Sequence, residues 1–378
     1  MDLDLTPEQK RIHSSALEFL KKESPVELMR EQRENPLGYS RKAWKKMAEL
    51  GWQGIMIPEA YNGMGGDVVD LTLILEAMGR FCYQGPYFSS IVLGGTAIMA
   101  AGSDQQKAHL LPGLTDGDLI LSLALMEPGS TFGREKMRTE LVLEGEEFIL
   151  TGTKLFVENA HNANLILCVA ETAGTADGNN ELSVAMLDPN APGVTIRPMD
   201  TLAYDKQAEV VFDHVRVSRK DVLGSVDGAN AAIAQVLETA ALAKCAEMVG
   251  ILQTVFEMTV AYAKDRRQFG KAIGSFQAVQ HHCANMVVDV DGARFLTYRA
   301  AWKKAQNMPA AKETAMAKAW VSDAGRRVTA LGHQIHGAIS FCDEHDMHLY
   351  YRRAKACEVA FGDAAYHLEK IADMMALT

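Results

Sequence analysis

One acid, Glu247, interrupts the apolar part of a long predicted helix and is the first candidate for proton transfer. Its neighbours are Ala246, Met248 and Val249. Burial disfavours the ionised form of a carboxyl group, so we expect the pKa of Glu247 to be raised. A raised pKa suits a general base that works near neutral pH. The alternative is a structural role, in which Glu247 pairs with a buried Arg or His of the same helical region.

The same helix ends in a turn rich in Arg, Phe and Gly, with the sequence DRRQFGKAIG at 265–274. A planar guanidinium such as that of Arg266 can pair with two phosphate oxygens at once. An arginine at a helix end beside a buried Phe269 can also be an ordinary surface residue. We expect the chemistry to lie along the stretch 238–280.

Paired histidines do not predict a metal site. His281 and His282 are adjacent, so they face different sides of a helix. His333 and His336 share a face, but no third ligand is apparent, and ordinary hydrogen-bonded histidines are predicted. The six cysteines show no CxxC pair and indicate reduced thiols in a cytoplasmic protein.

The composition is that of an ordinary soluble globular protein, with 48% hydrophobic and 23% charged residues. A net charge of −10 argues against nonspecific nucleic-acid binding. We expect no apolar run long enough to span a bilayer, and we do not expect the acidic start to act as a signal peptide.

Periodicity divides the 378 residues into three parts. Residues 1–118 predict a helical domain that opens with a capping box at Thr6, Pro7 and Gln9. Residues 119–228 hold short strand-like runs between Gly- and Pro-rich turns, which predicts a β-sandwich or barrel. Residues 229–378 predict a four-helix bundle with helices at 229–264, 276–306, 311–334 and 346–376. The fold class is therefore α+β, in the order α, β, α.

This order and several phrases resemble the acyl-CoA dehydrogenase family over nearly the whole chain. The phrases are WKKMAELGWQGIMIPEAYNGMGG, GSDQQKAHLLPGLTDGDLILSLALMEPGS, DRRQFGKAIGSFQAVQH and QIHGAISF. The third matches the family's Arg-x-x-Phe-Gly…Gln signature, and the fourth matches a degraded form of its Gln-x-x-Gly-Gly segment.

The resemblance implies FAD held between the β domain and the bundle, with an acyl-CoA thioester against the flavin. A Glu base would take the α-proton while flavin N5 takes a hydride from the β-carbon. Electrons would pass to an electron-transfer flavoprotein or an equivalent acceptor. A tetramer, homomeric or heteromeric, and a role in lipid or carboxylic acid catabolism are also implied.

The resemblance assigns cofactor contacts residue by residue. The pyrophosphate and adenosine half of FAD would be held from a neighbouring subunit by Arg266, Gln268, Phe269 and Gln277. Its adenosine end would touch Gln334, Gly337 and Ala338, where Ala338 replaces the family's second glycine. On the ring side, Leu125 and Met126 at the end of the flavin-contacting strand would contact the cofactor, Phe156 would stack on the ring, and Glu158 would lie beside N5.

Two positions depart from the family on the ring side. Met126 stands where the family has a Thr whose hydroxyl bonds the pyrimidine edge of the flavin, so only backbone N–H groups could serve there. A carboxylate at Glu158 would disfavour the anionic reduced flavin unless it is protonated or turned away.

Both of the family's usual base positions are empty in this sequence. Phe361 stands where most members have the Glu of a Tyr-Glu-Gly-Thr phrase, and Ala240 stands where a minority carry a Glu on the long helix. Glu247 lies seven residues beyond Ala240, on nearly the same face and about 10 Å further along the axis. Glu238 points away from that face, and Asp363 is expected to make a structural contact.

Three functions remain open at this point. The chain could be a catalytic acyl-CoA dehydrogenase with Glu247 as base. It could be a catalytically degenerate subunit that completes a partner's FAD site in a heterotetramer. It could also be an oxidase or a reductase on the same fold. The displaced base favours a branched, cyclic or steroid-like acyl group over a straight one.

Overall fold

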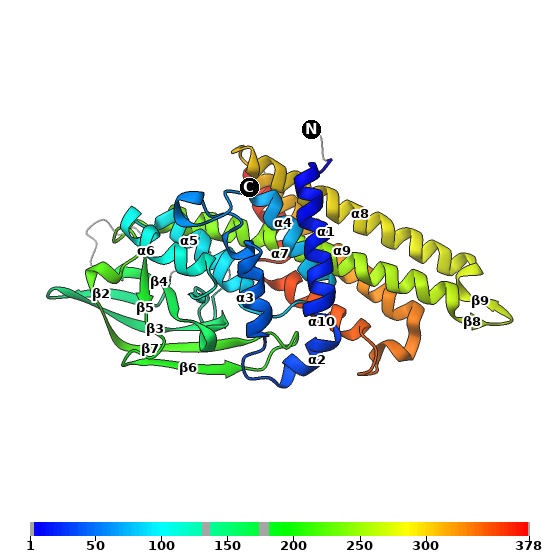
Figure 1. The fold of residues 1–378 in the computed structure, drawn as a ribbon, viewed down its shortest axis with the longest axis horizontal. Coiled ribbons are helices and arrows are strands. Elements are labelled where there is room, and N and C mark those ends of the chain that lie inside the picture. The colour runs from blue at the N-terminus through cyan, green and yellow to red at the C-terminus, as the bar shows by residue number, and fades with distance from the viewer. Residues whose placement is uncertain (1–3, 131–136, 174–180, 377–378) are drawn as a thin grey trace. The chain divides into compact units, whose positions relative to one another are not determined.

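The computed structural model describes residues 4–130, 137–173 and 181–376 (Figure 1). These residues form two compact units. The bundle unit comprises residues 1–31, 67–83 and 241–378, and the sheet unit comprises residues 32–66 and 84–240. The domain boundaries at 118/119 and 228/229 stay predictions.

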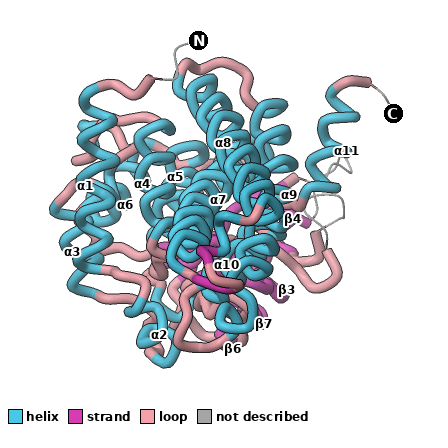
Figure 2. The backbone as a smooth tube through the Cα atoms, turned by 90° about the vertical axis from the view of Figure 1, so that its right-hand side faces the viewer, coloured by secondary structure: helices cyan, strands magenta, loops and turns pink. Residues whose placement is uncertain are grey.

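Long helices make up the bundle unit. They are α1 (Pro7–Glu23), α4 (Val68–Arg80), α7 (Asn230–Asp265), α8 (Gln277–Ala305), α9 (Ala311–His336), α10 (Met347–Val359) and α11 (Ala364–Met374). Helix α7 begins in the sheet unit and continues in the bundle unit. Helices α8, α10 and α11 each pack against α9 (Figure 2). The capping box predicted at Thr6 and Gln9 is confirmed.

The prediction of one continuous helix over 346–376 is wrong. Helix α10 ends at Val359 and α11 begins at Ala364. Phe361 and Gly362 between them have φ of 56° and 93°, which an α-helix cannot accommodate. The Asp363 side chain then accepts the Tyr366 N–H at 2.9 Å and caps α11, so its expected structural contact is confirmed.

Helices α4 and α7 approach each other unusually closely. A Cβ atom at Gly79 would lie 1.9 Å from the Glu247 carbonyl oxygen, and one at Gly250 would lie 1.9 Å from the Glu76 carbonyl oxygen. Only glycine fits at either position. This close backbone contact therefore fixes the position of Glu247 along the length of α4.

The sheet unit holds one seven-stranded sheet. Its strands are β1 (Leu121–Ala124), β2 (Glu140–Glu144), β3 (Glu147–Glu158), β4 (Leu165–Ala173), β5 (Leu182–Leu187), β6 (Val194–Met199) and β7 (Gln207–Val217). The order is β1-β4-β2-β3-β7-β6, and β5 also pairs with β4. Strand β4 runs parallel to β1 and β2, and the other pairs are antiparallel. Helices α3 (Arg41–Glu49), α5 (Thr96–Ala101) and α6 (Asp104–Thr115) belong to the same unit, and the residues of α2 (Glu27–Glu34) are divided between the two units.

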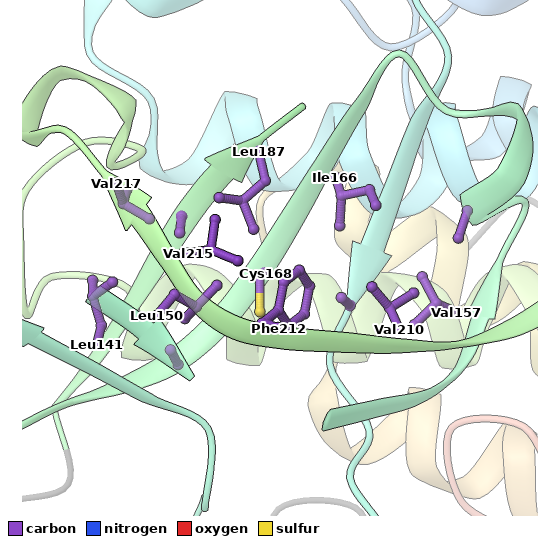
Figure 3. Packing of buried hydrophobic residues seen from close by; sticks show 14 of the residues in the cluster. Leu141, Leu150, Val157, Ile166, Cys168, Leu187, Val210, Phe212, Val215 and Val217 are labelled. Atoms are coloured by element: carbon purple, nitrogen blue, oxygen red, sulfur yellow. The ribbon is translucent and has the colours of Figure 1, made fainter. Parts of the chain in front are cut away.

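Alternating side chains of the curled sheet share one apolar core (Figure 3). Strand β7 contributes Val210, Phe212, Val215 and Val217, while Cys168 on β4 lies fully buried among them. This inward alternation is what a sandwich or barrel requires, and the predicted α, β, α architecture is confirmed.

Helix α7 is long and apolar enough to cross a membrane by length and composition, contrary to the sequence expectation. Its most apolar window is 83% buried inside the protein. Burial of this kind is typical of the central helix of a helical bundle.

Candidate active site

The backbone just after β1 is held against β3. Leu125 and Met126 follow the last residue of the strand, and the Leu155 N–H donates to the Met126 carbonyl at 2.8 Å. The next residue, Phe156, has φ of 55° at an irregularity in the β3–β7 register, and its side chain is 53% exposed. The bulge therefore turns an aromatic ring outward from the sheet.

A buried ion pair lies directly beneath this segment. Lys154 of β3 is fully buried, and its Nζ donates to Glu127 Oε1 at 2.7 Å and to the Leu125 carbonyl at 3.1 Å. Glu127 also accepts the N–H groups of Arg138 and Thr139 at 2.7 and 2.9 Å. Burial would raise the pKa of Glu127, but the hydrogen bonds from Lys154, Thr139 and Arg138 and the positive charge of Lys154 together outweigh it and hold the pKa below its ordinary value.

Sequence reasoning missed this pair. A signal was present, because a lysine in a strand core needs a partner, and Glu127 is the acid next to the flavin-strand residues named above. At the far end of β3, the Ser122 hydroxyl donates to the backbone carbonyl of Glu158 at 2.7 Å. Glu158 is thus anchored through its backbone.

Glu247 lies in a buried ion cluster of the bundle unit. Its Oε1 accepts the Nε–H of Arg353 on α10 at 2.5 Å, and its Oε2 accepts from Nζ of Lys244, one turn earlier on α7, at 3.2 Å. All three side chains are at least nine-tenths buried. The pairing with a buried Arg that the sequence left as the alternative is present.

The expected upward shift of the Glu247 pKa is wrong. Burial alone would raise it, but the positive charges of Arg353 and Lys244 together with their hydrogen bonds lower the pKa to about 2. Glu247 is therefore ionised at neutral pH. Burial of Glu247 can be inferred from its neighbours in the sequence, whereas its contact with Arg353, 106 positions further along the chain, cannot.

This shift predicts how stability responds to acid. The folded-state pKa lies below the ordinary value of 4.5, so on acidification the unfolded chain takes up the proton first. The contribution of Glu247 is full above pH 4.5 and is lost as pH falls toward 2. Urea unfolding of the wild type and Glu247→Gln between pH 6 and 3.5 should show a stability difference that shrinks with pH. A difference that stays constant would contradict the lowered pKa.

The loop between α10 and α11 is locked from two sides. The buried Lys318 of α9 donates to the carbonyls of Glu358 at 2.8 Å and Gly362 at 2.7 Å. His367 of α11 contacts the Phe361 carbonyl through Nε2 at 3.0 Å. Burial lowers the pKa of His367 to about 4, so at neutral pH the ring is neutral and its Nε2 carries the proton it donates.

The turn after α7 is a two-residue hairpin. Strand β8 (Arg267–Gln268) pairs with β9 (Lys271–Ala272), and the central Phe269 and Gly270 have φ of 54° and 80°. Positive φ at both positions is the type I′ geometry, which normally selects Asn-Gly. Phenylalanine in that conformation is strained, and its side chain is 91% exposed. A strained, exposed aromatic points to a binding role.

The remaining hairpin residues are also exposed. Arg266 stands at the end of α7, where its carbonyl accepts the Ile273 N–H at 2.8 Å and closes the hairpin. Gln268 lies in β8, and Gln277 is the first residue of α8. The idea of a surface Arg beside a buried Phe269 is thereby excluded.

The end of α9 carries the other predicted contacts. Gln334, Gly337 and Ala338 are exposed, and a Cβ atom at Gly337 would meet nothing within 4 Å. Nearby, His333 Nδ1 bonds the Ser340 hydroxyl and His336 Nδ1 bonds the Gly332 carbonyl, both at 2.8 Å. The hydrogen-bonded histidines predicted here are confirmed. In the described ranges, no group of three or more His, Cys, Asp or Glu side chains could hold a metal.

The sequence matches three family models in order. They are the N-terminal domain of acyl-CoA dehydrogenase over residues 6–118, the middle domain over 122–215 and the C-terminal domain over 227–376. Probable acyl-CoA dehydrogenase YngJ of Bacillus subtilis (strain 168) is 32% identical over 372 residues, covering 96% of each chain. The chain belongs to the acyl-CoA dehydrogenase family.

Two further relatives bear on its chemistry. Acryloyl-CoA reductase (NADH) of Anaerotignum propionicum is 30% identical, over 98% of this chain and 95% of that protein. A solved FAD complex of PigA has a TM-score of 0.91 at 25% identity and covers all of both chains. Acyl-CoA dehydrogenases are oxidoreductases that act on CH–CH bonds of acyl-CoA, with FAD as cofactor, and this chain is such an enzyme.

The chain's own residues fit FAD. The half-exposed Phe156 offers a stacking face, and the exposed Arg266 offers a charge that suits a pyrophosphate. The strained Phe269 and the open space over Gly337 suit an adenosine group. Which of these residues contact FAD in this acyl-CoA dehydrogenase stays a prediction.

Proposed function

We propose that this chain catalyses the α,β-dehydrogenation of an acyl-CoA thioester and passes the electrons to an electron-transfer flavoprotein or an equivalent acceptor. Bound FAD would accept the hydride from the β-carbon. The observation that carries this proposal is the exposed hairpin with Arg266 and the strained Phe269, in a chain that matches all three family domains in order.

We assign removal of the α-proton to Glu247. Its ion pairs keep it ionised at neutral pH, which is the state that accepts a proton. The same ion pairs make it a weak base, so this assignment requires the contact with Arg353 to loosen when substrate is bound. Asp363 is unsuited to the role because its carboxylate caps α11.

The ion cluster around Glu247 also supports a second candidate function, one without catalysis by this chain. If Glu247 stays paired with Arg353 and Lys244, it is not free to take the proton, and Phe361 and Ala240 occupy the family's two base positions. The chain would then be a degenerate subunit that completes the FAD site of a partner. The reverse direction, reduction of an unsaturated acyl-CoA, needs the same groups and is supported by the named reductase relative.

The visible spectrum of the chain purified alone separates these possibilities. We expect a yellow protein whose flavin absorption bleaches when an acyl-CoA is added without oxygen. Branched, cyclic and steroid-like acyl groups should bleach it faster than straight ones. A colourless protein that turns yellow only with a partner chain would overturn the first proposal and support the second. Bleaching that is coupled to O₂ consumption would indicate an oxidase.

We also propose an oligomeric state and a cellular location for this chain. Val288 and Phe295, seven residues apart on α8, and Trp320 on α9 are exposed apolar side chains on the bundle unit. Such residues favour association with further subunits, and we propose a homo- or heterotetramer. The six cysteines are free thiols, which favours a reducing compartment, and we propose the cytoplasm.

A further inference from the structure

Lys154 is unusual because a fully buried lysine must be matched by nearby acceptors. Its Nζ has two kinds of acceptor, a carboxylate oxygen of Glu127 at 2.7 Å and the backbone carbonyl of Leu125 at 3.1 Å. If Lys154 served only to neutralise the Glu127 carboxylate, its contact with Glu127 would be enough. The second reaches the backbone that follows β1, which is the segment implied to face the flavin.

The hydrogen bond from Lys154 to the Leu125 carbonyl also fixes the direction of the Met126 N–H, which lies on the opposite side of the same peptide bond. In a trans peptide the C=O and N–H bonds point in opposite directions. Because the Leu125 carbonyl is turned toward Lys154, the Met126 N–H is turned away from it. The Met126 thioether has no hydrogen to donate, so this N–H is the donor that position 126 can offer.

The neighbouring residues reinforce the same segment. The Leu155 N–H donates to the Met126 carbonyl at 2.8 Å. The Glu127 N–H donates to the Ser130 hydroxyl at 3.1 Å, and that hydroxyl donates to the Glu127 carbonyl at 3.0 Å. Phe156 follows directly in the bulge. Lys154 therefore ties together the two backbone stretches that carry the Met126 N–H and the Phe156 ring.

We propose that Lys154 is a positioning residue for the flavin ring, which fixes the direction of the Met126 N–H and the place of Phe156 through the Leu125 carbonyl and Glu127. The inference rests on the proposed function in that FAD must bind at this segment. It explains how a chain without the family's Thr hydroxyl can still present an ordered donor.

The test must separate positioning from charge neutralisation. Lys154→Met alone leaves the Glu127 carboxylate buried without its counter-ion, so it loses stability for electrostatic reasons as well. The double variant Lys154→Met/Glu127→Gln removes both charges and keeps one amide oxygen as an acceptor for one of the two N–H groups of Arg138 and Thr139, which donate to different carboxylate oxygens of Glu127. Leu150→Ala, a truncation in the core of the same strand, controls for loss of stability alone (Figure 3).

FAD affinity of the apoproteins is measured by fluorescence titration, together with the visible spectrum and urea unfolding. We expect the double variant to regain most of the stability lost in Lys154→Met. It should still bind FAD about tenfold or more weakly, the loss of roughly one well-placed hydrogen bond. Its flavin band should also be shifted. Leu150→Ala should lose stability but keep the wild-type spectrum.

Wild-type affinity and an unshifted spectrum in the double variant would overturn the inference while leaving the proposed function intact. A wild-type chain that has no affinity for FAD would overturn both. A flavin band shifted equally in Leu150→Ala would also overturn the inference, because the shift would then result from lost stability and not from lost positioning of the flavin ring.

Discussion

Glu247→Gln is expected to lower the free energy of unfolding by about 3–5 kcal/mol, the range for removing one partner of a buried ion pair. Arg353 and Lys244 would stay buried with their charges facing a neutral amide. Urea unfolding near neutral pH measures the difference. The loss of stability should appear as a lower urea concentration at the unfolding midpoint. The slope of the unfolding free energy against urea concentration should stay unchanged, because the surface exposed on unfolding is the same.

Glu257→Gln is the matched control on the same helix. Glu257 of α7 pairs with Arg80 of α4 at 2.5 Å, but its side chain is about half exposed. Exposed pairs contribute about 0–1 kcal/mol, so the control should be nearly neutral. Equal losses in the two variants would show that burial of the Glu247 cluster is unimportant. A loss below about 1 kcal/mol in Glu247→Gln would contradict the ion pairs described.

Arg266→Ala is expected to weaken FAD binding by about 10- to 100-fold, from the 1.5–3 kcal/mol of a hydrogen bond to a charged group. Phe269→Ala should weaken it as well, through lost stacking. Both side chains are exposed, so stability of the free chain should change by less than about 0.5 kcal/mol. FAD titration of the apoproteins and urea unfolding measure the two effects separately.

Arg267→Ala is the control for charge at the hairpin. Arg267 is an exposed neighbour in β8 with the same charge, but it lies outside the matched signature positions. Its replacement should leave FAD affinity within about threefold, as expected for a screened surface charge. If Arg266→Ala and Arg267→Ala weaken FAD binding equally, Arg266 contributes only general positive charge and makes no specific contact with FAD.

Local signals made much of the fold predictable. The capping box at Thr6 and Gln9, the apolar length of α7 and the strand alternation around Phe212 each depend on neighbours within a few residues. The sheet order was not predictable in the same way. The parallel pairing of β4 with both β1 and β2 joins segments that no local pattern links.

The break between α10 and α11 was readable but missed. Gly362 followed by Asp363 is a helix-stop and N-cap signal, which the prediction of a single helix over 346–376 did not include.

The site was less predictable because its electrostatics are nonlocal. Lys244 is one turn from Glu247 and could have been paired with it from sequence. Arg353 lies on another helix, and only together with Lys244 does it outweigh desolvation in setting the pKa of Glu247. The pair of Lys154 and Glu127 likewise joins strand β3 to the segment that follows β1. The sequence located the acid on α7 and could not give its charge state.

The most direct measurement is anaerobic stopped-flow bleaching of the bound flavin by acyl-CoA, in the wild type and in Glu247→Gln, each purified alone. We predict a yellow wild type that bleaches. We predict a Glu247→Gln variant that keeps its FAD but bleaches about 10²- to 10⁴-fold more slowly, as expected for loss of a general base. A colourless wild type, or a folded Glu247→Gln variant that bleaches at the wild-type rate, would contradict proton removal by Glu247 in this chain.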